Sequence, residues 1–142
     1  MRILLILLSS CLVLYTGNKV TAESGQHSHH HHSQLDISNL ANKPKVELKV
    51  IKDSVSGWNV YAKTTNFRFA PENVNSKQVI GEGHAHLYVD GKKITRLYSQ
   101  WYHLSNLSKG AHIVKVSLNA NDHAELVLGK ETVSASVTII QK

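Results

Sequence analysis

Short runs of alternating apolar and polar residues follow one another through most of the chain after residue 45. Alternation with a period of two places side chains on opposite faces of the backbone and is typical of half-buried strands. No stretch after residue 40 repeats its apolar residues with the period of a helix, and turn residues recur every eight to twelve positions or so. The pattern predicts strands at residues 46–51, 57–62, 64–69, 84–89, 94–98, 100–104, 111–118, 126–128 and 132–140.

Strands of this length, separated by turns, predict an all-β domain, an antiparallel two-sheet sandwich with about seven to nine strands. Asp90 and Gly91 are expected to form a tight hairpin turn, because glycine accepts a positive φ angle and aspartate tolerates one. The apolar faces of the central and C-terminal strands supply the expected core, which comprises Leu87, Val89, Val114, Val116, Val137 and Ile139.

The most informative strand is the one that begins with Gly-His-Ala-His at residues 83–86. Alternation places His84, His86 and Tyr88 on one face of this strand, while Ala85, Leu87 and Val89 share the other face. Two imidazoles side by side on a rigid strand are a common way to present nitrogen ligands to zinc or copper. The alternative interpretation is a pair of surface histidines beside a turn.

Further histidines lie next to turns elsewhere in the predicted domain. His103 and His123 are expected to meet His84 and His86 at one end of the sandwich and to form a site for copper(II) or zinc. Asp122 is a further candidate, either as a ligand or as the acceptor that orients a ring. His112 follows a glycine turn, where a hydrogen-bonded histidine at a sheet edge is the simpler interpretation.

Residues 1–22 have the pattern of a secretory signal peptide: a basic start, a short apolar run and small residues before a cleavage point after Ala22. The sequence around Cys11 also resembles a lipoprotein cleavage box, which is the less favoured alternative. Residues 23–44 are expected to form a disordered, histidine-rich tail, and residues 45–142 the sandwich domain. The tail offers an auxiliary metal-binding set, unless it is an expression tag or a plain linker: His27, His29, His30, His31 and His32.

Several functions are excluded or disfavoured by what the sequence lacks. Cys11 is the only cysteine and leaves with the signal peptide, which excludes a blue-copper site, a disulfide and a cysteine nucleophile. There is no nucleophile elbow, phosphate-binding loop or zinc-protease helix, so we do not expect an enzyme. Basic residues are scattered apart from Lys92 and Lys93, so no nucleic-acid partner is expected. No transmembrane segment is expected in the mature chain.

The motifs at residues 83–91, 101–104 and 109–123 together resemble a group of small exported bacterial domains. They share a Gly-His-x-His-Leu signature with a domain family of unknown function, and the resemblance covers roughly residues 46–140. It implies an immunoglobulin-like or cupredoxin-like sandwich and an exported setting, and it implies no particular reaction.

Taken together, these patterns predict a periplasmic or secreted protein that binds copper(II) or zinc through a histidine cluster and buffers, delivers or senses the ion. The alternative is an immunoglobulin-like interaction or structural module, whose partner is another exported protein and whose histidines are incidental.

Overall fold

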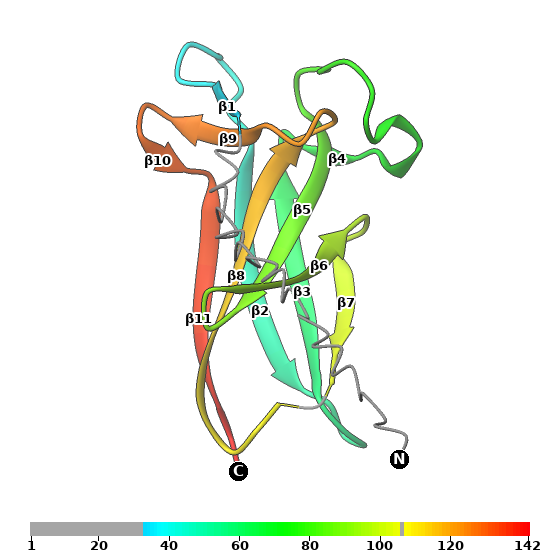
Figure 1. Ribbon diagram of the computed structural model, residues 1–142, viewed down its shortest axis with the longest axis vertical. Helices are drawn as coiled ribbons and strands as arrows, with labels where there is room; N and C mark the ends of the chain where they lie inside the picture. Colours follow the sequence, from blue (N-terminus) through cyan, green and yellow to red (C-terminus); the bar gives the residue numbers. More distant parts are fainter. Residues whose placement is uncertain (1–32, 106) are drawn as a thin grey trace, which may run out of the picture. The chain divides into compact units, whose positions relative to one another are not determined.

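The computed structural model describes residues 33–105 and 107–142, which form strands and one short 3-10 helix (Figure 1). The predicted signal peptide and the five tail histidines lie outside the described residues. The elements are β1 (Gln34–Asp36), β2 (Lys45–Lys52), β3 (Trp58–Thr65), β4 (Arg68–Phe69), η1 (Pro71–Asn73), β5 (Glu82–Val89), β6 (Lys92–Leu97), β7 (Trp101–Leu104), β8 (Gly110–Ala120), β9 (Glu125–Leu128), β10 (Glu131–Thr132) and β11 (Ser134–Gln141).

The larger of two sheets has eight strands and is built around β5 and β8. Its order is β1-β9-β8-β5-β4, with β10 paired to β9, β11 to β8 and β6 to β5. The long strand β8 pairs with β5 along one side, whereas along its other side β11 pairs first and β9 follows at Asn119. The strand that carries the His-x-His motif therefore lies at the middle of this sheet.

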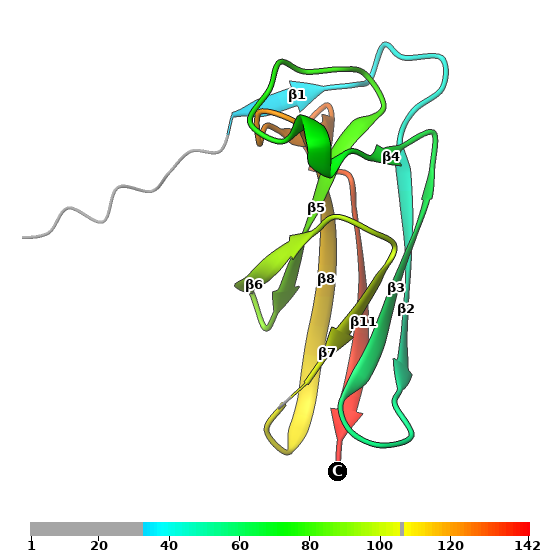
Figure 2. The same cartoon turned by 90° about the vertical axis from the view of Figure 1, so that its right-hand side faces the viewer.

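The smaller sheet contains the antiparallel strands β2, β3 and β7 in that order. Figure 2 shows β2 and β3 beside β8 and β11, and the side chains between the two sheets form the core. Alternation along β3 sends Val60 and Ala62 inward, and both are fully buried. The prediction of an all-β, two-sheet sandwich is thus confirmed.

The predicted core is also confirmed for most of its members. Leu87, Val114 and Val116 are fully buried, and Val89 and Ile139 are nearly so, whereas Val137 is half-buried and packs against the core from its edge. These side chains come from β5, β8 and β11, which are neighbours in the large sheet, so one face of that sheet supplies a continuous apolar layer.

The predicted hairpin turn lies between β5 and β6. Asp90 has a φ angle of 51° and Gly91 one of 79°, and two successive positive φ angles are the requirement of the tight turn that joins twisted antiparallel strands. The turn pairs Tyr88 with Lys93, and a β-bulge beyond it, between Leu87 and Tyr88, shifts the register so that Arg96 lies opposite His86. Two basic residues, Lys93 and Arg96, therefore lie opposite Tyr88 and His86.

Strand direction and number differ from the prediction. The described part of the chain has eleven strands, and two pairings in the large sheet are parallel: β1 with β9, and β4 with β5. Strands of two or three residues, such as β4 and β1, carry too few side chains to show an alternation, which is why the pattern missed them. The sheet is therefore mixed, and its antiparallel character holds for the long strands.

The domain boundary expected at residue 45 lies too late. Leu35, at the middle of β1, pairs with Leu126, and Ile37 is 2% exposed within the core. An isolated isoleucine between polar residues gives no periodic signal, although one buried side chain and three paired residues suffice to attach this segment. The region from residue 33 to residue 44 is therefore part of the sandwich.

No helix in residues 33–105 and 107–142 combines the length and apolar character needed to cross a lipid bilayer.

Candidate metal centre

His84 and His86 project side by side from β5, on the face opposite the core residues Ala85 and Leu87, as alternation along the strand requires. Both histidines are only 1% exposed. Their Nε2 atoms lie 3.1 Å apart, and the ring centroids are separated by 4.9 Å. The pair is thus buried with two nitrogens turned toward one point.

A third histidine reaches the same point from the turn between β8 and β9. His84 pairs with Asn119 across the sheet, and four residues later the chain has turned back, so that Nδ1 of His123 lies 3.1 Å from Nε2 of His84. The turn is closed by the backbone N–H of His123, which donates to the carbonyl of Ala120 at 3.0 Å. His123 has a φ angle of 71°, an uncommon conformation for a residue other than glycine.

The three rings form a group whose geometry suits a metal ion. One nitrogen from each of His84, His86 and His123 lies within 4.8 Å of the others, so the described residues contain a histidine cluster able to hold a metal. Zinc at about 2.0–2.1 Å from tetrahedral imidazole nitrogens places those nitrogens roughly 3.3 Å apart. The two observed separations of 3.1 Å require little movement to reach this value.

The environment keeps His84 in the form that binds metals. The pKa of His84 is lowered from 6.5 to about 4, mainly by burial and to a smaller extent by the positive charges of His123, Arg96 and Lys93. The ring is therefore neutral near pH 7, and the neutral imidazole is the ligating form. Nδ1 of His84 is buried and has no hydrogen-bond partner, so no hydrogen bond to this second nitrogen orients the ring.

His123, in contrast, is oriented by a hydrogen bond. Its Nε2 lies 2.6 Å from Oδ1 of Asn75, an oxygen that only accepts, so Nε2 carries the hydrogen and Nδ1 turns its lone pair toward His84. Fixing the tautomer of a ligand through its second nitrogen is a general property of histidine metal sites. Asn75 was not predicted, because a single asparagine in a polar loop gives no signal in the sequence.

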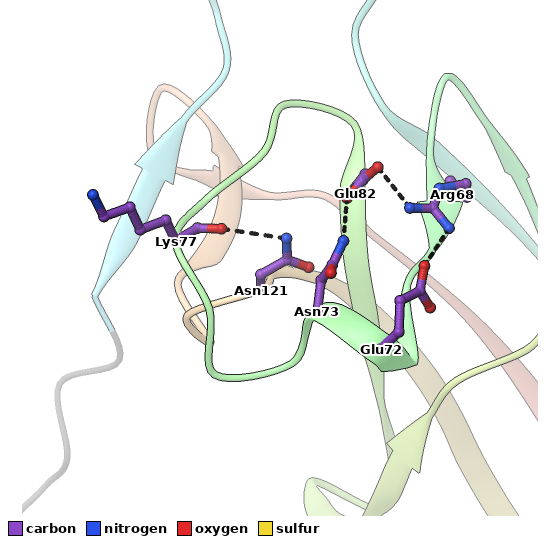
Figure 3. Close-up of polar contacts among 6 residues, drawn as sticks. All are labelled: Arg68, Glu72, Asn73, Lys77, Glu82 and Asn121. Atoms are coloured by element: carbon purple, nitrogen blue, oxygen red, sulfur yellow. Dashed lines mark hydrogen bonds and ion pairs between the residues drawn. The ribbon is translucent and has the colours of Figure 1, made fainter.

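The loop that carries Asn75 is tied down at both ends (Figure 3). Glu72 and Glu82 both accept from the Arg68 guanidinium, at 2.6 and 2.7 Å, and Glu82 also accepts from the Asn73 amide at 2.9 Å. Arg68 lowers the pKa of both carboxyl groups, which stay charged near neutral pH. These contacts fix the side of the loop that follows β4.

The other side of the same loop rests on the buried residue Asn121. The Asn121 side-chain amide donates to the carbonyl of Lys77, and the backbone carbonyl of Asn121 accepts from the backbone N–H of Asn75 at 2.8 Å. Asn121 directly follows β8 and lies two positions before His123. One segment therefore holds both the ligand and the residue that orients it.

Two predicted ligands do not join this cluster. His103 lies on β7 in the small sheet, where it is exposed and its Nδ1 is 3.3 Å from Oδ1 of Asn59. Asp122 accepts from Gln78 at 2.7 Å and from the backbone N–H of Ala124 at 3.1 Å, so it stabilises the turn. The four-histidine site is thus corrected to three, because alternation does not tell to which sheet a strand belongs.

His112 has the hydrogen-bonded position expected at a sheet edge. Its Nδ1 lies 2.7 Å from Oδ2 of Asp90, and its Nε2 lies 2.8 Å from the carbonyl oxygen of Ser108. The Asp90 carboxylate raises the pKa of His112, and the carbonyl of Ser108 acts in the same direction. This histidine connects the β5–β6 turn to the start of β8 and takes no part in the cluster.

Two further polar side chains beside the cluster escaped the prediction of ligands. Nζ of Lys93 lies 3.0 Å from Nε2 of His86, and the hydroxyl of Tyr88 lies 3.4 Å from Nδ1 of the same ring. Alternation along β5 placed Tyr88 on the face of His86, and the two-residue turn at Asp90 and Gly91 pairs Lys93 with Tyr88 on that face.

Comparison of the chain with models of known protein families, with curated proteins and with solved structures gives no match. The case for a function therefore rests on the residues of the cluster and on their surroundings.

Proposed function

We propose that this is an exported protein that binds copper(II) or zinc through His84, His86 and His123, and that it buffers, delivers or senses the ion. The observation that carries the proposal is the convergence of three ring nitrogens within 4.8 Å of one another. A buried cluster of imidazoles is costly unless it is hydrogen-bonded or bound to a ligand, and Nδ1 of His84 has no hydrogen-bond partner.

The donor atoms support the choice of metals. Imidazole nitrogen suits zinc and copper(II), whereas magnesium and calcium prefer oxygen ligands, and among the described residues no carboxylate belongs to the cluster. Three protein ligands leave a fourth position for water or for a group of another molecule. An incomplete coordination shell supports exchange of the ion with a partner better than permanent storage.

Export is supported by the sequence of residues 1–22, and the histidines at 27 and 29–32 offer a second, weaker set of ligands on the same chain. In this proposal the tail captures ions and the cluster in the sandwich receives them for transfer, so the ion is cargo. The resemblance to exported bacterial domains supports the same setting, in the periplasm or outside the cell.

The test is a titration with zinc and with copper(II), followed by calorimetry and by elemental analysis of the dialysed protein. The background is the full exported chain in which the five tail histidines are replaced by serine. We expect one equivalent of metal, lost in His86→Ala and retained in His103→Ala, since His103 lies in the other sheet. Absence of binding in this background would contradict the proposal and favour the interaction module.

A further inference from the structure

A positive charge lies against the histidine cluster, within hydrogen-bond distance of one of its nitrogens. Nζ of Lys93 is 3.0 Å from Nε2 of His86, and the same Nε2 is 3.1 Å from Nε2 of His84. Lys93 reaches this position because the two-residue turn between β5 and β6 pairs it with Tyr88, whose side chain shares the face of His86. The contact is therefore part of the hairpin geometry.

The chemistry of the two groups decides how the contact is made. A lysine ammonium has donors and no acceptor, so Nε2 of His86 accepts the hydrogen bond with its lone pair. A metal ion bound to Nε2 needs that same lone pair. A neutral imidazole nitrogen has one lone pair in the ring plane, so the ammonium and the metal exclude each other at this atom.

Charge acts in the same direction as the hydrogen bond. Two like charges a few ångströms apart repel each other strongly when they are partly shielded from water, and Arg96, opposite His86 on β6, adds a second positive charge nearby. A divalent ion in the cluster would therefore push the Lys93 ammonium outward. The backbone of Lys93 lies in an exposed stretch of β6, so its flexible side chain has solvent into which it can turn.

We propose that Lys93 sets the metal affinity of the cluster by competing with the ion for His86, an inference that rests on the proposed function. Without metal, the ammonium satisfies the buried ring nitrogen and keeps the site closed to adventitious cations. When a metal ion binds, the ammonium moves away from His86. It can bind to His86 again, which assists release of the ion. Lys93 thus tunes the affinity of a site that exchanges its ion.

The experiment compares two single substitutions in the background without tail histidines. Lys93→Met keeps the length of the side chain and removes its charge, while Lys92→Met removes the same charge from the exposed neighbouring residue. We expect Lys93→Met to bind zinc and copper(II) at least about tenfold more tightly, and Lys92→Met to stay within about twofold of the parent protein. Both dissociation constants come from competition with a chromophoric chelator.

A second measurement detects the contact itself. In metal-free protein, Lys93→Met should shift the nitrogen-15 resonance of His86 Nε2, and Lys92→Met should leave it unchanged. Metal binding with equal affinity in all three proteins would overturn the role of Lys93 and leave the proposed function standing. Weaker binding by Lys93→Met would also overturn it, because it would make the lysine a supporting group. No binding by any of the three would remove the proposed function and this inference together.

Discussion

Nε2 of His84 lies 3.1 Å from Nδ1 of His123, although the two residues are 39 positions apart in the sequence. The contact follows from the register of two strands, because β5 and β8 pair His84 with Asn119 just before the turn that carries His123. A slip of one residue would send every side chain of β5 to the opposite face. The cluster therefore depends on the packing that fixes this register.

We predict that Gly83→Ala disrupts the cluster through the fold. A Cβ atom at Gly83 would lie 1.9 Å from the carbonyl oxygen of Asn119, so β5 and β8 would have to move apart. We expect a loss of several kcal/mol in the free energy of unfolding, together with loss of metal binding. Urea denaturation measures the first quantity.

The matched control is Gly91→Ala, at a position where an added Cβ meets no atom within 4 Å. Its cost is the positive φ angle alone, roughly 1 to 2 kcal/mol, and the cluster should keep its metal. Equal destabilisation by the two substitutions would refute the role of close strand approach at Gly83.

Substitution of His123 should separate metal binding from stability. The left-handed backbone at this position favours glycine, so we expect His123→Gly to be more stable than His123→Ala by roughly 1 kcal/mol. Both proteins should lose most of their affinity for zinc, because the third ligand is gone. Thermal unfolding and chelator competition test the two statements, and tight zinc binding by either variant would exclude His123 as a ligand.

Asn75 should affect affinity through the orientation of the His123 ring. Asn75→Gly removes the acceptor of the His123 hydrogen bond while tolerating the φ angle of 65°, and we expect zinc affinity to fall by about 10- to 100-fold. Asn66→Gly is the control. Asn66 also has a positive φ angle, 54°, but its side-chain amide donates to the backbone carbonyl of Lys43. An unchanged affinity in Asn75→Gly would show that packing alone orients the ring.

The metal-free protein should lose stability as the pH falls from about 6.5 to about 4. The pKa of His84 is 6.5 when unperturbed and about 4 in the folded protein. Between these pH values His84 is protonated in the unfolded chain and neutral in the folded protein, which favours unfolding. The loss is at most about 3 kcal/mol, because solvent near the cluster reduces the effect. Thermal unfolding with a chelator present, at several pH values, measures it.

The contribution of His112 to stability changes with pH in the opposite direction from that of His84, because His112 is paired with Asp90. Asp90 raises the pKa of His112, so this contribution is fully present below about pH 6.5 and is lost as the pH rises through the folded-state pKa. His112→Gln should therefore reduce the loss of stability on the alkaline side of the stability-versus-pH curve. His84→Phe should reduce the loss on the acidic side. An acidic slope that survives His84→Phe would assign it to another group.

The sequence predicted the parts of this structure that repeat over several residues. Alternation along 84–89 correctly placed His84 and His86 on one face and Leu87 in the core, because the period of a strand is strict. It failed for His103, since two adjacent strands look alike whether they share a sheet or belong to different sheets. Nor could it show which of His103 and His123 joins the pair, because nothing local reveals where a turn points its side chain.

The short strand pairings could not be predicted from the sequence for a different reason. β1 and β4 have three and two residues, and each is held by backbone hydrogen bonds to a partner that is remote in sequence. Asn75 belongs to the same category, because a loop brings it to His123. Such contacts form only in the assembled fold, whereas the long strands can be predicted from the alternation of their own side chains.

The two ends of the described domain leave it at opposite ends of β8. The carbonyl of Ser33 accepts from Glu125, two residues beyond His123, whereas Gln141 pairs with Gly110 at the other end of β8 (Figure 1). A fusion partner or a surface linkage placed after Lys142 is thus held away from the histidines, while one placed just before Ser33 is delivered beside them. A sensor built on this protein should be immobilised through its C-terminus.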